Sequence, residues 1–462
     1  GRIVDGHCSH TLGNLYIQKR KVVFHGGSLL VLLYLRCSPA HTPSMDDTTI
    51  SKRQRSYTLF LLVIVFTASH VDRQIVAILQ EPIKQAFQIS DTQLGLLTGF
   101  MFALFYATLG MPMAMWADRR NRRNLIAFSI SLWSAMTVFC GMAVQFWQLL
   151  LARIGVGVGE AGSNPPSHSI ISDLYKPEER ATAMAIFGLG VNFGIMLGYL
   201  IGGWVNEWIG WRWAFVVAGV PGLIIAVIVR WTMVEPPRGY SDGLVEKPQA
   251  PPFWSVVRHM LNSSATRQLV IANSLISMAG YAAIAWAPVY FQRVHGFSTA
   301  ESGTFLALAI GVGGGLGTFF GGFFADRWAK ISEGWRAWVV CAATTVYLPS
   351  AVLCYLTADP FWAIIWFIGP AALGGVYIGT NFAILQSLAP VEMRAVMAAI
   401  NLFILNIVGL GLGPVGVGFI SDLATPAFGI ESIRYGLLAT LVVMAWGALH
   451  QARVGLLLHR QT

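Results

Sequence analysis

The chain has 462 residues, of which 55% are hydrophobic and only 11% are charged, and its formal net charge is +9. A soluble domain carries about 25% charged residues, so this composition excludes an ordinary soluble protein and indicates an integral membrane protein. The basic residues lie mainly between apolar runs, where they orient a protein in a membrane, so nucleic acid is not an expected partner. The five cysteines show neither disulfide nor metal-ligand spacing, and no cofactor or metal is expected.

Residues 1–44 differ from the rest of the chain. They begin with Gly1, contain the basic run KRK, and have one apolar run, Val22 to Leu35, that is too short to cross a bilayer. Met45, followed by two aspartates, has the character of a natural start. We expect residues 1–44 to be a disordered upstream extension or an artefact outside the folded protein.

Twelve apolar runs follow, each near the length of about 20 residues that a helix needs to cross a bilayer. The first six are 57–80, 93–115, 124–143, 146–173, 181–203 and 213–233. The last six are 268–291, 303–325, 337–357, 361–387, 395–420 and 433–454. The sequence therefore predicts an all-α membrane protein with one six-helix bundle over 45–233 and another over 268–462.

A polar segment, residues 234–267, separates the two predicted bundles. Its Pro-rich part, Glu235 to Pro252, is typical of a linker. Apolar residues then recur at helical spacing: Phe253, Val256, Val257, Met260 and Leu261. This pattern predicts a short helix lying on the membrane surface. Pro165 and Pro166 predict a kink or an unwound turn at the inner end of span four.

Lysine and arginine gather in alternate connecting segments. One set of segments holds residues such as Arg119, Arg120, Arg122 and Arg123, whereas the other set holds only Lys84, Arg212, Arg293 and Arg434. The positive-inside rule then places both termini in the cytoplasm. We expect a multi-pass protein of the cell membrane, such as a bacterial inner membrane, in contact with membrane lipids.

The two halves of the chain share short motifs. The second span is followed by AMWADRRNRR and the eighth by GFFADRWAK, so Asp118 corresponds to Asp326. The fourth span is followed by PEERATAMA and the tenth by PVEMRAVMAA, so Arg180 corresponds to Arg394. Such a duplicated six-helix unit around a central cavity is typical of transporters.

These motifs also carry a resemblance to a known family. AMWADRRNRR, LLLARIGVGVGEA and GWRWAF resemble signatures of the major facilitator superfamily. HVDRQIVAILQEPIKQAFQISDTQLGLL, GVGEA, ISDLY and GFISD resemble the spinster branch. The resemblance implies a monomer of two pseudo-symmetric six-helix bundles that works by alternating access. For animal members it implies anionic lipid-like substrates, such as sphingosine 1-phosphate or lysophospholipids, and for bacterial members proton coupling.

Four ionisable residues lie inside the predicted spans: Asp72 and Arg73 in span one, and Arg153 and Glu160 in span four. Each costs about 2.5–3.5 kcal/mol on insertion scales, so such residues usually serve a function. Arg153 and Glu160 are two helical turns apart and share a helix face with Gly157. The resemblance implies that spans one and four both line the central cavity. Depths counted along these two spans then predict an Asp72–Arg153 pair, with Arg73 and Glu160 close by.

Two interpretations of this cluster stay open. It could be a structural set of ion pairs that holds two helices together. It could instead couple transport to protons through Asp72 and Glu160 and bind an anionic head group through Arg73 and Arg153. Further polar residues in the spans could line the cavity or form interhelical hydrogen bonds: Asn192, Tyr281, Thr380 and Asn381.

Gly157, Gly159 and Gly162 spell G-x-G-x-x-G, the fingerprint of a dinucleotide-binding turn. That motif requires a preceding strand and a following helix, whereas here it lies inside one long apolar segment. We expect these glycines to let neighbouring helices or the cargo approach closely.

The resemblance implies that charged residues at the inner ends of the spans form a cytoplasmic gate. These residues are Asp118, Arg119, Arg123 and Arg180 in the first half and Asp326, Arg327 and Arg394 in the second. A simple topology signal is the alternative.

The sequence as a whole predicts a proton-coupled secondary transporter for an anionic, amphipathic, lipid-like molecule. A major facilitator for a soluble organic anion, a sugar acid or a drug is the alternative within transport. A non-transporting lipid receptor is the alternative from another class. No catalytic constellation lies at matched depths, so an enzyme is not expected.

Overall fold

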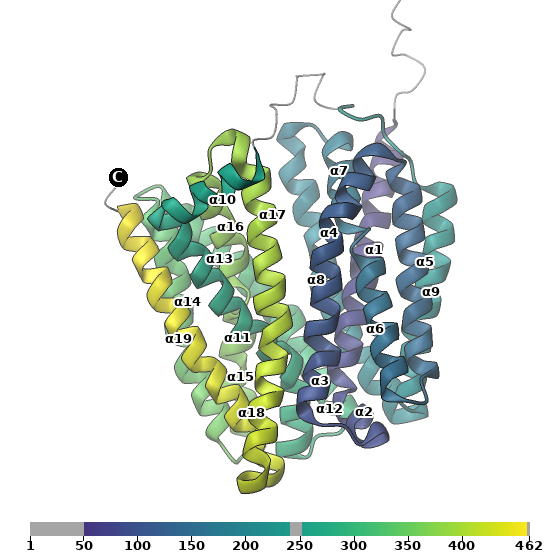
Figure 1. Cartoon of the computed structure of the whole chain (residues 1–462), viewed down its shortest axis with the longest axis vertical. Helices are drawn as coiled ribbons and strands as arrows, with labels where there is room; N and C mark the ends of the chain where they lie inside the picture. Colours follow the sequence, from purple (N-terminus) through teal and green to yellow (C-terminus); the bar gives the residue numbers. More distant parts are fainter. Residues whose placement is uncertain (1–49, 241–251, 460–462) are drawn as a thin grey trace, which may run out of the picture. The chain divides into compact units, whose positions relative to one another are not determined.

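The apolar runs fold as helices, because a helix satisfies its own backbone hydrogen bonds where no water is present. The computed structural model describes residues 50–240 and 252–459, all of which belong to one compact unit, Ile50–Thr462. The extension predicted over residues 1–44 lies outside the described residues. Figure 1 shows two groups of long helices side by side, one from each half of the chain.

The first half forms six spans. Its helices are α1 (Lys52–Ile78), α2 (Gln80–Phe87), α3 (Asp91–Gly95), the π-helical turn η2 (Leu96–Phe100), α4 (Met101–Arg119), α5 (Arg122–Met142), α6 (Phe146–Glu160), α7 (Asn164–Leu174), α8 (Pro177–Ile209) and α9 (Trp211–Thr232). The second span runs without a break from α3 through η2 into α4. A turn at residues 161–163 divides the fourth span, and Pro165 and Pro166 lie at the start of α7, as predicted.

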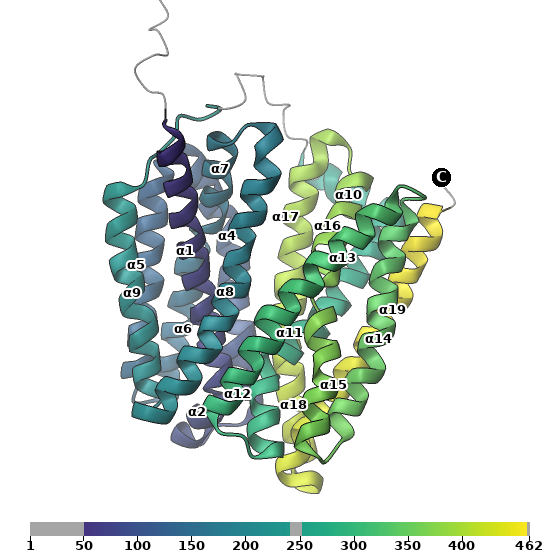
Figure 2. The ribbon, with the colours of Figure 1, turned by 180° about the vertical axis from the view of Figure 1, so that it is seen from behind.

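The second half repeats this arrangement after the helix α10 (Phe253–Asn262). Its helices are α11 (Ser264–His295), α12 (Thr299–Leu306), η3 (Ala307–Gly313), α13 (Gly314–Ala329), α14 (Gly334–Leu356), α15 (Pro360–Leu373), α16 (Val376–Leu388), η4 (Val391–Met393), α17 (Arg394–Ile404), η5 (Leu405–Leu412), α18 (Gly413–Phe428), η6 (Gly429–Glu431) and α19 (Ser432–His459). The same two groups of helices are visible from behind in Figure 2.

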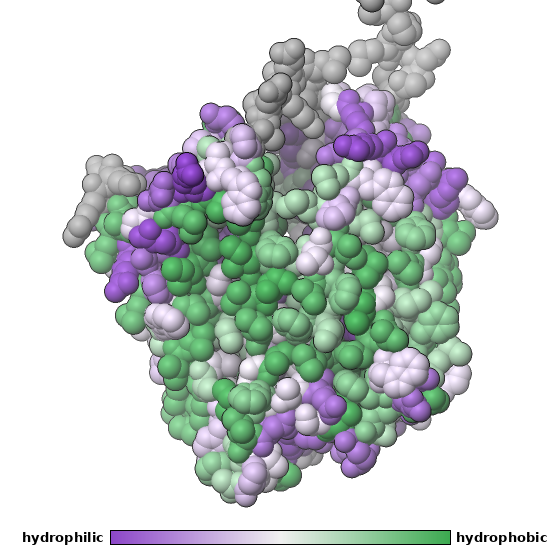
Figure 3. Space-filling view, in the orientation of Figure 1, coloured by the Kyte–Doolittle hydropathy of each residue, from purple (hydrophilic) through white to green (hydrophobic). Residues whose placement is uncertain are grey.

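Ten helical segments among the described residues are long and apolar enough to cross a membrane. The last of these, Val391–His459, contains two spans joined by η6. The fourth span is a further one, because it is divided into α6 and α7, neither of which is long enough alone to cross a membrane. The twelve predicted spans are therefore confirmed. Figure 3 shows a broad apolar band with hydrophilic residues gathered at both ends of the helices, as a bilayer core of about 30 Å requires.

We call the two ends of the bundles the linker face and the far face. The linker face carries α10 and the turn between α4 and α5, and the far face carries α2 and η6 (Figure 1). The helix predicted after the linker is present as α10, with Val256 and Met260 buried and Trp254 exposed.

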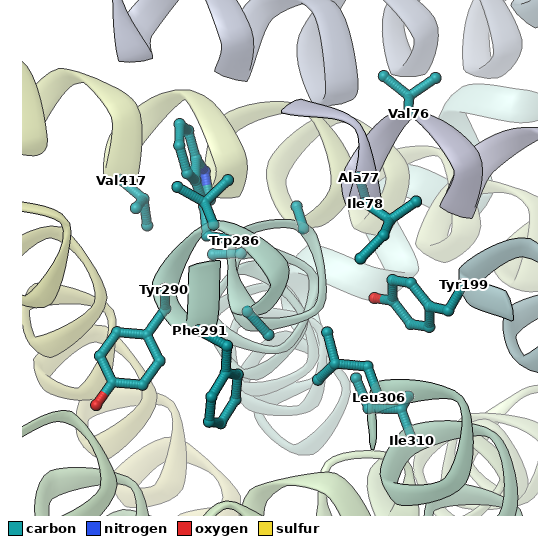
Figure 4. Close-up of a cluster of buried hydrophobic side chains, with 14 of the residues drawn as sticks. Val76, Ala77, Ile78, Tyr199, Trp286, Tyr290, Phe291, Leu306, Ile310 and Val417 are labelled. Carbon is teal, nitrogen blue, oxygen red and sulfur yellow. The ribbon is translucent and has the colours of Figure 1, made fainter. Parts of the chain in front are cut away.

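One apolar core joins the two halves toward the far face (Figure 4). Ile78 of α1 and Tyr199 of α8 lie in it together with Trp286 of α11 and Leu306 of α12. The Tyr199 hydroxyl also donates a hydrogen bond to the carbonyl oxygen of Ile284, at 2.9 Å. Separate clusters lie nearer the linker face within each half. The two halves therefore pack together most extensively near the far face.

Glycine permits this close packing at two helix pairs. A Cβ atom at Gly418 of α18 would lie 2.2 Å from the carbonyl oxygen of Asp91. A Cβ atom at Gly203 of α8 would lie 2.6 Å from the carbonyl oxygen of Thr299. Neither position could carry a larger residue without separating the helices, because both neighbouring atoms belong to the backbone.

Candidate functional site

Arg73 of α1 and Glu160 of α6 form an ion pair inside the first half. Arg73 Nε and Nη2 both donate to Glu160 Oε2, at 2.8 and 2.6 Å. The Glu160 side chain is 1% exposed and that of Arg73 is 17% exposed. Removing one partner of a buried ion pair costs about 3–5 kcal/mol, so this contact holds α1 and α6 in register.

Asp72 and Arg153 also lie in this cluster, but they do not form the predicted pair. Arg153 Nη1 donates to the main-chain oxygen of Asp72, at 3.4 Å, whereas the Asp72 carboxylate accepts from Thr137 Oγ1 of α5, at 3.0 Å. Neighbouring residues on a helix point about 100° apart, so Asp72 faces α5 while Arg73 faces α6. The prediction of the four residues as one group holds, and the predicted pairing is wrong.

Each of three members of this charge cluster has a buried polar atom without a hydrogen-bond partner among the described residues. These atoms are Asp72 Oδ1, Arg153 Nε and Glu160 Oε1. Buried polar atoms are nearly always paired in proteins, and unpaired ones often mark a functional site. The charge cluster therefore has spare capacity to accept a proton or to bind an anion.

Two aromatic residues of α4 complete the site. The Arg73 Cζ atom lies 4.8 Å from the ring centroid of Phe102 and 4.7 Å from that of Tyr106. The Arg153 Cζ atom lies 5.4 Å from the Phe102 ring. These distances are within the range of cation–π attraction. Sequence reasoning missed both aromatic residues, because nothing in an apolar span distinguishes them from rings that face lipid.

The glycine run of α6 forms the surface on which the neighbouring helices pack. A Cβ atom at Gly157 would lie 2.9 Å from the Phe102 carbonyl oxygen, and one at Gly159 would lie 2.7 Å from the Trp133 amide nitrogen. Gly157 and Gly159 lie inside α6 and Gly162 lies in the turn that follows it, with a helix and not a strand before the motif, so the interpretation as a contact face is confirmed and a dinucleotide turn is excluded.

The other predicted binding residues are spread over the molecule. Tyr281 of α11 lies near enough to Arg73 and Tyr106 to interact with them electrostatically, so it joins the site from the second half. Asn192 of α8 packs against Gly315 of α13 at the seam between the halves.

Thr380 and Asn381 of α16 are buried, and their contacts lie within the second half. The Thr380 hydroxyl donates to its own helix at Val376, and Asn381 Oδ1 accepts from Gln451 Nε2 of α19, at 2.7 Å. The structure therefore assigns both residues to helix contacts and does not bring them to the charge cluster.

The residues predicted to form a cytoplasmic gate lie at the linker face. Asp118 pairs with Arg238 at 3.8 Å, and Asp326 pairs with Arg336 at 3.2 Å. Arg123 and Arg180 donate to main-chain oxygens of Met233 and Ser172, and Arg394 donates to that of Ala389, while Arg119 and Arg327 are exposed. Each of these contacts joins two residues on the same side of the seam.

Arg122 is the most deeply buried charge at the linker face. It donates to Asp173 of α7, to Glu235 Oε1 at 2.9 Å and to the carbonyl oxygen of Pro236 at 2.6 Å. It thereby fixes the start of the linker to the first half. Sequence reasoning counted Arg122 only as a topology signal, although it lies three residues after the ADR tripeptide that the two halves share.

Ion pairs join the two halves at the far face instead. Asp91 of α3 is fully buried and accepts from Lys84 Nζ at 2.6 Å and from Arg293 Nη1 of α11 at 2.8 Å. Arg293 also pairs with Glu81, at 2.8 Å. Sequence reasoning used Lys84 and Arg293 only to orient the chain.

Two copies of the tripeptide Ile-Ser-Asp meet in this far-face network, residues 89–91 and 420–422. Ser421 Oγ donates to Asp91 Oδ2 at 2.7 Å, and Asp422 Oδ1 accepts from the Asp91 amide at 2.9 Å. Asp422 Oδ2 accepts from the amide and the hydroxyl of Thr92. The Asp422 carboxylate thus caps the N-terminus of a helix from the other half. The same tripeptide also occurs at residues 171–173, where its aspartate contacts Arg122 at the linker face, so the repetition alone does not reveal this network.

Comparison with known proteins decides the family. The Major Facilitator Superfamily model matches residues 60–414. The chain belongs to the major facilitator superfamily. It is therefore a transporter and not an enzyme, with the fold of two six-helix bundles described above.

Within the superfamily, the chain is similar to spinster proteins. The crystal structure of a bacterial homolog of the human lysosomal transporter Spinster, inward-facing and unoccupied, superposes with a TM-score of 0.80 at 29% identity, covering 89% of this chain and 99% of that one. The mouse sphingosine-1-phosphate transporter SPNS2 is 28% identical over 82% of this chain and 73% of its own length.

Other relatives carry different names. An MFS-type efflux pump of Mycolicibacterium smegmatis is 32% identical over 83% of this chain and 88% of its own length. A probable galactarate/D-glucarate transporter, GudP of Bacillus subtilis, is 24% identical over 88% of this chain and 93% of its own length.

Proposed function

We propose that this transporter moves an anionic, amphipathic, lipid-like molecule by proton-coupled alternating access. The observation that carries the proposal is the buried Arg73–Glu160 ion pair beside Asp72 and Arg153. In a membrane-embedded cluster of arginines and carboxylates, an arginine can release the carboxylate side chain and bind the anionic group of a substrate instead. A lysophospholipid or a molecule of the sphingosine 1-phosphate type supplies such an anion on an apolar tail.

Proton uptake would free the arginines. Glu160 Oε1 and Asp72 Oδ1 have no hydrogen-bond partners among the described residues, so each can take a proton without first breaking a hydrogen bond. A neutral Glu160 holds Arg73 less tightly, because a charge-assisted hydrogen bond is about twice as strong as a neutral one. Arg73 and Arg153 then bind the anionic head group, and Tyr281 closes the site from the second half.

Alternating access would exchange the far-face network for contacts at the linker face. Asp118, Arg119, Arg123 and Arg180 would meet the second-half set Asp326, Arg327 and Arg394 when the linker face closes. The far-face contacts of Asp91 with Arg293 and Asp422 would then break. The duplicated motifs support this exchange, since equivalent residues of two repeats can alternate in closing a pathway.

We place the linker face in the cytoplasm of a bacterial inner membrane, with both termini inside. The arginine-rich turn Arg119–Arg123 supports this orientation under the positive-inside rule. The bundles over 45–233 and 268–462 would act as two bodies of a monomer surrounded by membrane lipids.

The lipid-like cargo rests on the similarity to spinster proteins, among them a sphingosine-1-phosphate transporter. A soluble sugar acid is the second candidate. The similarity to a probable galactarate/D-glucarate transporter favours it, and arginine also binds carboxylates. In that case the protein would transport a sugar acid such as D-glucarate and would not transport lysolipids.

Uptake into proteoliposomes with an imposed pH gradient tests the proposal. A panel of lysophospholipids, sphingosine 1-phosphate and D-glucarate would be offered to the wild-type chain, to Glu160→Gln and to Glu392→Gln, an exposed carboxylate that serves as the matched control. We expect gradient-driven uptake of a lysolipid that Glu160→Gln loses and Glu392→Gln keeps. Full gradient-driven uptake by Glu160→Gln would refute proton coupling through this residue, and uptake of D-glucarate alone would refute the lipid cargo.

A further inference from the structure

Phe102 is the one residue whose ring contacts both Arg73 and Arg153 among the residues that the structure describes. Its ring centroid lies 4.8 Å from Arg73 Cζ and 5.4 Å from Arg153 Cζ, and the residue is 1% exposed. Arg73 belongs to α1 and Arg153 to α6, so a single ring of α4 touches cations on two other helices. A cation over a desolvated aromatic face is attracted by the negative charge of the ring face.

The backbone of α4 is pressed against α6 at this point. Gly157 lies between Arg153 and Glu160, and a Cβ atom there would come within 2.9 Å of the Phe102 carbonyl oxygen and 3.4 Å of its ring. The position of Phe102 therefore depends on a glycine in the charged face of α6. Any shift of α6 or of its charges is transmitted to Phe102 by direct contact.

The same span reaches the far-face network within a few turns. The π-helical turn η2 (Leu96–Phe100) directly precedes α4, and such turns frequently occur at functional sites. In η2, a Cβ atom at Gly99 would lie 2.7 Å from the carbonyl oxygen of Leu410 in the second half. At the far-face end of the span, Asp91 pairs with Arg293, and its amide donates to Asp422. One continuous helix thus connects the arginine site with the contacts that close the far face.

We propose that Phe102 is a positioning residue that couples the charge state of the Arg73–Glu160 pair to the opening of the far face. This inference rests on the proposed function, in which Glu160 gains and loses a proton. When Arg73 leaves Glu160 to bind an anion, its contact with the Phe102 ring changes. Phe102 then moves with η2 and α4 relative to α6, and the glycine contacts of η2 and the Asp91 network loosen together.

The charged and titratable groups around Glu160 all enter this coupling. They are His70, Asp72 and Arg73 from α1, Cys140 from α5, Arg153 from α6, Tyr106 from α4 and Tyr281 from α11. Phe102 carries no charge, so replacing it removes a contact without adding or removing a titrating group. This makes its variants a clean test of mechanical coupling.

The test measures a distance across the far face rather than transport. Spin labels would be placed at Val144→Cys and Ile430→Cys, which are exposed in the first and the second half. Cys8, Cys37 and Cys341 would first be replaced by serine, while Cys140 and Cys354 are buried. Distance distributions of the full chain in lipid nanodiscs report the fraction open at the far face without any cargo.

Glu160→Gln mimics the protonated residue in this assay. With the natural Phe102, we expect it to raise the ratio of far-face-open to far-face-closed molecules by about fivefold or more, the usual lower range of coupling between sites. In a Phe102→Leu background the same change should move the ratio by less than about twofold. Phe102→Tyr keeps the ring and should restore the response.

Phe187→Leu is the matched control, since Phe187 is equally buried and contacts no guanidinium among the described residues. Gly157→Ala is a second perturbation, which displaces Phe102 without altering it and should also blunt the response. It covers the case in which Phe102→Leu does not fold.

The outcomes separate the two proposals. An undiminished response to Glu160→Gln in both Phe102→Leu and Gly157→Ala overturns the role of Phe102. No response to Glu160→Gln in the wild-type background overturns the proposed coupling through Glu160, and the present inference with it. If no lysolipid is transported but the distances respond as expected, the proposed cargo is wrong and the role of Phe102 stands.

Discussion

The Arg73 guanidinium donates two hydrogen bonds to the same oxygen of Glu160, Oε2, at 2.8 and 2.6 Å. The other oxygen, Oε1, has no hydrogen-bond partner in the described part of the chain. Two donors of the planar guanidinium therefore point at Oε2, and Oε1 stays able to accept a proton.

Arg73→Lys tests whether the planar guanidinium group of Arg73 is needed to bind the anionic substrate. A lysine ammonium keeps the positive charge but presents no planar fork, so it cannot hold a carboxylate or a phosphate through two parallel donors. We expect the KM for the anionic substrate to rise by about tenfold or more, measured by initial uptake rates. Arg230→Lys, at an exposed position of α9, should leave the KM unchanged. An unaltered KM in Arg73→Lys would remove Arg73 from the binding site.

Asp72→Asn tests proton coupling in span one. Asparagine still accepts the hydrogen bond from Thr137 but takes no proton, so the fold should be kept and the driving force lost. We expect accumulation driven by a pH gradient to fall by about tenfold, while cargo exchange without a gradient continues.

Thr137→Val is the companion variant for Asp72. It removes the only hydrogen bond to the Asp72 carboxylate among the described residues and leaves the carboxylate in place. Driven accumulation should therefore persist with a changed pH profile. Wild-type accumulation by Asp72→Asn would show that Asp72 carries no coupled proton.

Asp422→Ala tests the far-face network. The Asp422 carboxylate accepts from the amides of Asp91 and Thr92, at 2.9 and 2.8 Å, and from the Thr92 hydroxyl. Since a hydrogen bond to a charged group contributes about 1.5–3 kcal/mol, we expect the far-face-open fraction to increase at least tenfold, measured by spin-label distances. Asp359→Ala removes a similar cap inside the second half and should not change the distances.

Gly418→Ala should block closure of the far face. Its Cβ atom would lie 2.2 Å from the Asp91 carbonyl oxygen, which is backbone and cannot move aside without separating α3 from α18. We expect cross-linking between cysteines at the far face to be lost and transport to stop. Gly379→Ala, which meets nothing within 4 Å, should behave as the wild type. Normal transport by Gly418→Ala would mean that this contact is not needed in the cycle.

Arg122→Ala should destabilise the first half. Arg122 is fully buried among Asp173, Glu235 and the Pro236 carbonyl group, so its removal leaves two carboxylates without their cation. We expect a loss of about 3–5 kcal/mol, seen as a lower Tm in detergent. The exposed Arg230→Ala serves as the control. An unchanged Tm would show that the carboxylates find other partners.

The spans, the duplicated halves and the membership of the charge cluster could be read from the sequence. The length of an apolar run and the repetition of ADR at Asp118 and Asp326 are local properties, and the structure confirms the twelve spans. The grouping of Asp72 with Arg153 followed from counting depth along two helices. Counting depth does not give the direction of a side chain around its helix, and the pairing predicted from it was wrong.

The far-face network and Phe102 could not be predicted in the same way. Asp91 and Arg293 are 202 residues apart and meet only because the two halves pack at that end. Phe102 looks like any aromatic residue of an apolar span until its ring is found beside Arg73 and Arg153.

The amino-acid sequence alone determined that this protein crosses the membrane twelve times, that its halves are repeats, and that charges lie inside spans one and four. These features depend on hydropathy and on the cost of burying charge, which act on each segment separately. Only the tertiary structure decided that Arg73 pairs with Glu160 and that the Asp422 carboxylate caps the N-terminus of α3 from the other half. Those choices depend on the rotation and crossing of packed helices, which are set by the contacts of the whole bundle rather than by any single span.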